Sequence, residues 1–173
     1  AKEATDILEE FDVFVGRTGL ESSAIEESAR GLIRLGQRGE ELMNTLQLLG
    51  DASGGTSAKF RSLSSSFIML EESMKRFPYM FRQLNRSGVI TLGDIARHFG
   101  VATTAAQAMV QKGKVSFADF KAILQENTAE GGRFHNMLQK QSQSLLGLKF
   151  SYNHAIKEIK EALGLPLLPY LES

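Results

Sequence analysis

The stretch GVITLGDIARHFGVATTAAQAMVQKGKVSFADF, residues 88–120, contains one pattern twice, 25 residues apart. Gly88 and Gly113 each stand where a helix can end in a left-handed residue, which glycine adopts without a steric penalty. Each glycine is followed by a short extended link and then by Thr or Ser with Asp three positions later. These pairs are Thr91–Asp94 and Ser116–Asp119. Because this spacing suits a capping box, we predict two helix–tight turn–helix corners in series.

Upstream of this repeat, apolar residues recur at helical spacing. They predict one helix that is closed by Gly16 and Gly19, and others over about 23–36, 40–49, 57–76 and 78–88. We expect a capping box, Ser23–Glu26, to open the second helix and Gly50 to end the third. The Gly- and Ser-rich stretch DASGGTS, residues 51–57, predicts a long turn. Pro78 suits the first turn of a new helix.

Downstream, residues 132–163 predict one long amphipathic helix. Its apolar residues keep steps of three and four, and we predict that they form a protein-contact face. This face consists of Phe134, Leu138, Leu145, Leu148, Tyr152, Ile156, Ile159 and Leu163. The alternative is that the same residues pack on the chain's own core. The apolar tail LPLLPYLES, residues 165–173, and the start at Ala1 without Met predict that the natural polypeptide is longer.

The fold class predicted from these patterns is all-α, a compact multi-helix domain of short helical hairpins with a long C-terminal helix. Three segments are distinguished: an acidic helical subdomain (1–57), central helical hairpins (58–131), and the long helix with its tail (132–173). They can equally form one continuous domain. Residues 1–57 carry eleven acidic and five basic side chains, whereas residues 58–173 carry nine acidic and fifteen basic ones. The two parts could attract each other within one chain or between chains, or be solvated helix faces.

Whole-chain composition bounds the function. Lys plus Arg equals Asp plus Glu at 20 each, so the net charge is zero, whereas nucleic-acid binders usually carry a basic excess. There is no Cys, which excludes disulfides and thiol nucleophiles. No run of about 18 apolar residues predicts a membrane span in these residues.

The 90–111 region also has the pattern of a DNA-reading helix-turn-helix. Its second helix, about residues 103–111, offers Thr103, Thr104, Gln107 and Gln111 but no Arg, which is weak for reading bases. Phosphate contacts would fall to Arg97, Lys112, Lys114 and Lys121. The competing interpretation is a plain helical hairpin whose apolar residues are core. That core would contain Ile95, Phe99, Val101, Ala106 and Val110.

No arrangement of residues predicts catalysis, a cofactor or a metal. His98, His135 and His154 lack metal-binding spacing. Adjacent carboxylates such as Glu9–Glu10 point apart on a helix, and neither a nucleophile elbow nor a phosphate loop with its Lys is present. We therefore predict that the chain is not an enzyme; a cell-wall hydrolase, which would need a perturbed carboxylate in a cleft, is the weakest alternative.

Several motifs occur together in a way that resembles one family. They are Thr18-Gly19-Leu20, Leu49-Gly50-Asp51-Ala52-Ser53-Gly54, Ile95-Ala96-Arg97-His98-Phe99-Gly100-Val101, Gly113-Lys114-Val115-Ser116, and EGGRFHNMLQKQSQSLLG at 130–147. The chain resembles, over almost its whole length, the N-terminal globular region of tail length tape-measure proteins of long-tailed phages and prophages. That family usually has a longer stretch between the fourth helix and the glycine turn.

This resemblance implies a structural role in tail assembly and tail-length determination, without catalytic residues. It implies partners among tail assembly chaperones, tail tube and tip proteins, and other copies of the chain, with no small-molecule substrate and no membrane contact by these residues. It places the protein in the virion tail, after synthesis in the bacterial cytoplasm. A DNA-contacting helix-turn-helix-like module is the alternative function.

Overall fold

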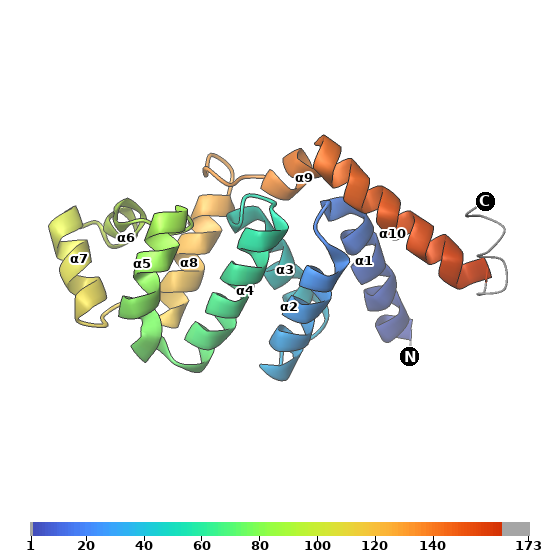
Figure 1. Ribbon diagram of the computed structural model, residues 1–173. Coiled ribbons are helices and arrows are strands. Elements are labelled where there is room, and N and C mark those ends of the chain that lie inside the picture. Colours follow the sequence, from blue (N-terminus) through green and yellow to red (C-terminus); the bar gives the residue numbers. More distant parts are fainter. Residues whose placement is uncertain (1, 164–173) are drawn as a thin grey trace.

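The structure is a computed structural model that describes residues 2–163, and within them the chain is helical without strands. Ten α-helices and one 3₁₀ turn follow one another (Figure 1). They are α1 (Lys2–Thr18), α2 (Ser22–Arg34), α3 (Gly39–Ala52), α4 (Ser57–Glu72), η1 (Met74–Arg76), α5 (Phe77–Ser87), α6 (Leu92–Phe99), α7 (Thr103–Gln111), α8 (Phe117–Thr128), α9 (Met137–Ser142) and α10 (Leu145–Leu163). The predicted all-α class is confirmed. The tail 165–173 lies outside the described residues.

The helices lie side by side in one elongated array, with α7 at one end and α1 and α10 at the other (Figure 1). Helix pairs far apart in the sequence pack together, such as α3 with α8 and α1 with α10. The buried apolar residues form one cluster, which extends from Val15 to Leu138 and includes residues of all three predicted segments.

Aromatic side chains join the middle of the array. Phe67 of α4 contacts Phe117 and Phe120 of α8, with ring centroids 5.0 and 6.1 Å apart. Phe77 of α5 lies 6.0 Å from Phe120 in an edge-on arrangement. Phe67, Phe77 and Phe120 are fully buried, so these three helices share one interior.

Both predicted corners form as the repeat indicates. Gly88 and Gly113 have φ values of 77° and 63°, in the left-handed region. The backbone N–H groups of Val89 and Lys114 donate back to the carbonyls of Leu84 and Met109, which closes the end of each preceding helix. Complete capping boxes then start the next helices, Thr91–Asp94 at α6 and Ser116–Asp119 at α8. Pro78 lies in the first turn of α5, as predicted.

Two local predictions in the first half of the chain are wrong. The Ser23–Glu26 capping box is absent, because the N-cap residue of α2 is Glu21, whose backbone N–H donates to Ser57 Oγ at 2.9 Å. Gly50 does not end the third helix but lies inside α3, which continues to Ala52. A helical glycine at position 50 is needed for packing, because a Cβ there would lie 2.3 Å from Leu138 Cδ1.

The predicted single helix over residues 132–163 is also corrected, because the chain breaks twice there. Left-handed residues Gly131 (φ 81°) and Asn136 (φ 54°) turn the chain between α8 and α9. A second turn at residues 143–144 separates α9 from α10. The C-terminal helix therefore starts at Leu145 and contains 19 residues.

Candidate protein-interaction surface

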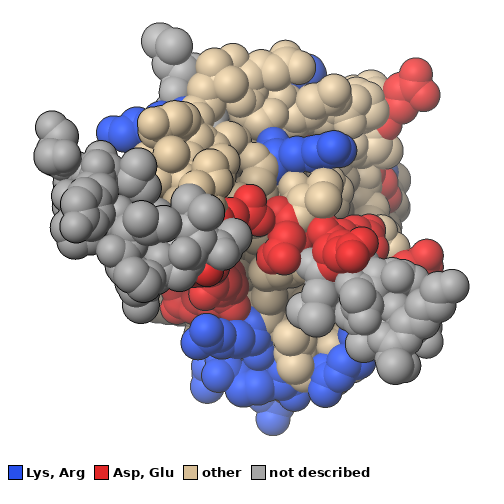
Figure 2. Space-filling model, turned by 90° about the vertical axis from the view of Figure 1, so that its right-hand side faces the viewer, with Lys and Arg blue, Asp and Glu red and all other residues tan. Residues whose placement is uncertain are grey.

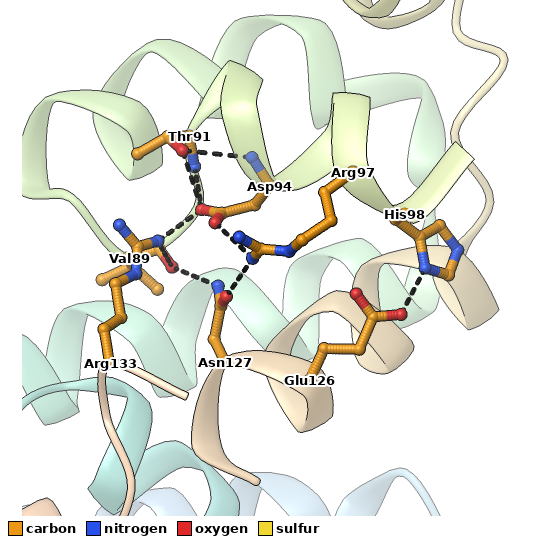
Figure 3. Close-up of polar contacts among 8 residues, drawn as sticks. All are labelled: Val89, Thr91, Asp94, Arg97, His98, Glu126, Asn127 and Arg133. Carbon is orange, nitrogen blue, oxygen red and sulfur yellow. Dashed lines mark hydrogen bonds and ion pairs between the residues drawn. The ribbon is translucent and has the colours of Figure 1, made fainter. Parts of the chain in front are cut away.

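The segment that carries the predicted contact face is anchored to the domain through Arg133. Its guanidinium pairs with the Asp94 carboxylate and donates to the Val89 carbonyl oxygen at 3.2 Å (Figure 3). The neighbouring Gly132 lies against α8, where an added Cβ would be 2.4 Å from the Asn127 carbonyl oxygen. The glycine and arginine of the EGGRF stretch thus fix the path of the chain from α8 to α9.

Asp94 is the centre of this anchor, and its side chain is only 5% exposed. One carboxylate oxygen accepts from the Thr91 backbone N–H at 2.7 Å and from its hydroxyl at 2.9 Å. The other accepts from Arg97 at 2.8 Å, and Arg97 also donates to the Asn127 side chain at 2.9 Å. A buried carboxylate with two arginine partners, one backbone donor and one hydroxyl donor is well satisfied, and this cluster joins α6, α8 and the loop before α9.

His98 forms a second polar link between α6 and α8. Its Nδ1 lies 2.6 Å from Glu126 Oε1, and its Nε2 lies 3.5 Å from Asp119 Oδ1. The hydrogen bond to Glu126 raises the pKa of His98, although burial opposes this. For Asp119, burial raises the pKa but is outweighed by hydrogen bonds from Ser116, which leave the pKa below its ordinary value.

Helix α9 docks on the end of α3 through the residues of the LGD motif. Leu138 is 2% exposed and covers Gly50, and its backbone N–H donates to Asp51 Oδ1 at 2.8 Å. The carboxylate of Asp51 therefore satisfies one free donor at the start of α9, where the helix dipole also favours negative charge. Gly55 packs closely on α9, because a Cβ there would lie 2.6 Å from Gln141 Cβ.

Helix α10 lies against α1, and it leaves part of the predicted contact face open. A Cβ added at Gly16 of α1 would be 3.2 Å from the His154 ring, so the two helices approach closely there. Leu148, Tyr152 and Ile159 are 56%, 66% and 50% exposed. Their spacing of four and seven residues places them on one side of the helix. We call these three residues the α10 stripe.

The structure divides the rest of the predicted face. Leu138 is part of the core and Phe134, half-buried, lies under the Arg133 guanidinium, 4.9 Å from its ring centroid. Ile156 is partly buried on α10. The side chains of Leu145 and Leu163 lie outside the described residues. The six described side chains therefore do not share one surface, and among them the part most open to a partner is the α10 stripe.

Two of the four cations considered for DNA, Arg97 and Lys121, have acidic neighbours. Arg97 is bound to Asp94 and Asn127, and Lys121 lines a hollow together with Glu40 and Glu41. Lys112 and Lys114 are exposed beyond the end of α7. The apolar positions of the hairpin pack inward, with Ile95, Ala106 and Val110 buried and Phe99 and Val101 partly so.

Among the described residues, no group of three or more His, Asp or Glu side chains is placed to hold a metal ion. None of the helices in this part of the chain is long and apolar enough to cross a membrane. The single-helix prediction placed His135 and His154 on one helix, but His135 precedes α9 and His154 lies in α10.

Burial raises the pKa of Glu71; the charge of Lys121 counteracts the increase, and the charge of Glu41 adds to it.

Sequence reasoning did not identify a groove between α5 and α7. It is lined by Tyr79, Arg82 and Arg86 from α5 and by Gln107 and Val110 from α7, among others. The signal was available, because steps of three and four place Tyr79, Arg82 and Arg86 on one side of a helix.

Comparison with known proteins gives no match. No protein-family model and no curated protein matches the chain, and no solved structure matches the fold.

Proposed function

We propose that this chain is a structural module of a phage or prophage tail tape-measure protein, which contributes to tail assembly and tail-length determination through protein–protein contacts. The proposal starts from the sequence resemblance. In the structure the motifs that carry the resemblance lie at helix junctions: Gly50 and Asp51 hold α9, and Arg133 holds the preceding loop. A role that depends on a stable helical body rather than on catalytic groups is consistent with this distribution.

The observation that carries the contact role is the α10 stripe. Exposing three large apolar side chains on one side of a 19-residue helix costs solvation free energy in the isolated chain. Exposed apolar surface of this kind often marks a protein-interaction site. Its partners would be a tail assembly chaperone, a tube or tip protein, or another copy of the chain, in the virion tail or in the bacterial cytoplasm before assembly.

The proposal is tested in a phage whose genome encodes this chain, with tails examined by negative-stain electron microscopy. In-frame deletions in the same open reading frame, outside the region coding for residues 2–163, should shorten tails in proportion to the codons removed. The double variant Leu148→Ser/Ile159→Ser should reduce the number of tails without changing their length. Normal tails in the absence of the chain would contradict the tape-measure role.

A matched control separates contact from folding. Lys149→Ser changes an exposed residue of α10 outside the stripe and should leave tail number unchanged. The far-ultraviolet circular dichroism and urea midpoint of each purified variant should equal those of the unmodified chain. If Leu148→Ser/Ile159→Ser tails were as numerous as normal ones, the stripe would have no contact role.

A further inference from the structure

The groove between α5 and α7 has an apolar floor, a basic rim and no carboxylate in its lining. It has a volume of about 770 Å³ and is lined by Phe81, Leu92 and Val110 as well as by the arginines Arg82 and Arg86. Such a combination accepts an amphipathic segment whose apolar side chain enters the groove while its carboxylates meet the rim.

The rim arginines are available to a partner. Arg82 and Arg86 are exposed, and neither forms an ion pair with any described residue of the chain. The guanidinium of Arg82 lies over the ring of Tyr79, 5.7 Å from its centroid, which holds the charge at the mouth of the groove. Tyr79 is itself 76% exposed. The sequence has no acidic residue between Glu72 and Asp94, so no nearby carboxylate on α5 neutralises this rim.

The opposite end of the array carries complementary chemistry. Helix α1 exposes Glu9, Glu10 and Asp12 around Val13, whose side chain is 47% exposed. None of these three carboxylates forms an ion pair with the residues described here. On the end of the molecule that carries α1 and α10, acidic side chains gather across the middle of the face, and basic side chains gather below them (Figure 2). In Figure 1 this end is farthest from α7.

We propose that a second copy of this chain places the acidic side of its α1 in the α5–α7 groove, so that copies associate head to tail. Val13 would enter over the apolar floor, and Glu9, Glu10 and Asp12 would meet Arg82 and Arg86. Because the two surfaces differ and lie at opposite ends, a pair of copies joined in this way keeps one free groove, on one copy, and one free α1, on the other. The association is heterologous, and it continues until it closes into a ring or forms a filament.

A protein segment fits the groove better than a nucleic acid does. The floor is apolar and offers an exposed ring at Tyr79 alone, whereas single-stranded nucleic acids use several aromatic platforms. The chain also has no net positive charge. This contact uses neither the α10 stripe nor any property of a phage tail, so it stands or falls independently of the proposed function.

The test is sedimentation velocity over a range of protein concentrations at low and high salt. The unmodified chain should show a mass that increases with concentration and decreases with salt, because charged pairs carry the contact. Arg82→Glu/Arg86→Glu (the groove variant) and Glu9→Lys/Glu10→Lys (the α1 variant) should each weaken association about tenfold or more in Kd. Circular dichroism and urea midpoints verify that both variants are folded.

Mixing the two variants provides the decisive measurement. The groove variant retains a normal α1, and the α1 variant retains a normal groove, so a mixture should associate although each variant alone associates weakly. The two charge-reversed surfaces are also complementary to each other, so the mass of the mixture should again increase with concentration. Lys59→Glu/Lys149→Glu makes the same charge change as the groove variant, at exposed positions outside both surfaces, and should associate like the unmodified chain.

Three results would overturn the proposal. One is an unmodified chain that stays monomeric at all concentrations at low salt. Another is a mixture of the two variants that remains monomeric. The third is a monomer that binds a fluorescent single-stranded or duplex DNA and loses this binding in the groove variant, which would make the groove a nucleic-acid contact. Leu148→Ser/Ile159→Ser should leave head-to-tail association unchanged. A failure of the head-to-tail proposal can therefore be distinguished from a failure of the proposed function.

Discussion

Replacing Gly50 by Ala should destabilise the protein, although helix propensity alone favours the change. Alanine in a helix interior is more favourable than glycine by about 1 kcal/mol. The new Cβ, however, would lie 2.3 Å from Leu138 Cδ1 and 2.8 Å from its Cγ. Leu138 is held in place by the bond from its own N–H to Asp51. Overpacking typically costs about 1–3 kcal/mol, and a clash with two atoms of one buried side chain should cost about 2–3 kcal/mol of that range. After the gain in helix propensity, we expect a net loss of about 1–2 kcal/mol in the free energy of unfolding.

A double-mutant cycle isolates this contact. Leu138→Ala alone removes a side chain that is 2% exposed and should cost about 2–5 kcal/mol. In Gly50→Ala/Leu138→Ala the new methyl group enters the space that the leucine leaves, so the overpacking cost disappears. The double variant should therefore be more stable than the sum of the single changes by about 2–3 kcal/mol.

The assay is urea unfolding followed by circular dichroism at constant pH and salt. Gly93→Ala serves as the matched control, because Gly93 is also helical but its added Cβ would meet only Thr91 Oγ1 at 3.5 Å, an ordinary contact. This control should be neutral or slightly stabilising. A Gly50→Ala protein as stable as the unmodified chain, or additive losses in the cycle, would refute the docking of α9 described above.

Three further predictions concern the polar links and the α1–α10 contact. In urea titrations, Asp94→Ala should lower the free energy of unfolding by about 3 kcal/mol, whereas Asp119→Ala should lower it by only about 1 kcal/mol. The difference is expected because Asp94 binds two arginines in addition to forming its capping box. Equal losses in the two variants would contradict this prediction. Because the pKa of His98 is raised in the folded protein, the stability that His98 contributes is fully present below its unfolded pKa of about 6.5 and is lost as the pH rises through the folded pKa. In urea unfolding titrations, the stability advantage of the unmodified chain over His98→Gln should therefore shrink above about pH 6.5. An advantage that does not change with pH would contradict this prediction. Gly16→Val should disturb the contact with His154 and so accelerate amide hydrogen exchange in α10 but not in α8. Exchange in peptides from each helix can be measured by mass spectrometry. Unchanged exchange in α10 would mean that the His154 contact does not hold that helix.

The sequence predicted both corners of the repeat, because neighbouring residues determine them, although the same kind of pattern at Ser23–Glu26 does not form a capping box. Each capping box involves two residues three positions apart, and each left-handed glycine closes its own helix, so the geometry of both corners follows from local chemistry. The break before α9 depends on residues distant in the chain: Arg133 meets Asp94, and Leu138 meets Asp51. Hydrophobic periodicity continues across that break, so it predicted one helix where tertiary contacts impose two.

The same limit applies to the contact face. A step of three or four residues shows which side chains share a side of a helix, but it does not show whether that side meets the core or the solvent. Leu138 and Leu148 have equivalent places in the pattern, yet one is 2% and the other 56% exposed. The difference arises because α9 has a glycine of α3 to cover, whereas Leu148 has no such neighbour among the described residues.

The motifs that carry the family resemblance therefore support the fold rather than form a surface. The residues at 49–54 and those at 130–138 are separated by some eighty positions, and they meet where α9 docks on α3 and where the loop before it is tied to α6. Of these residues, Gly50, Asp51 and Leu138 are buried, and Arg133 is paired with Asp94. The residues that act on partners should lie among the exposed and unpaired ones, which here are the α10 stripe, the basic rim of the α5–α7 groove and the acidic side of α1. Variants in the motifs should then impair function through lower stability, whereas variants on these surfaces should impair it in a fully folded protein.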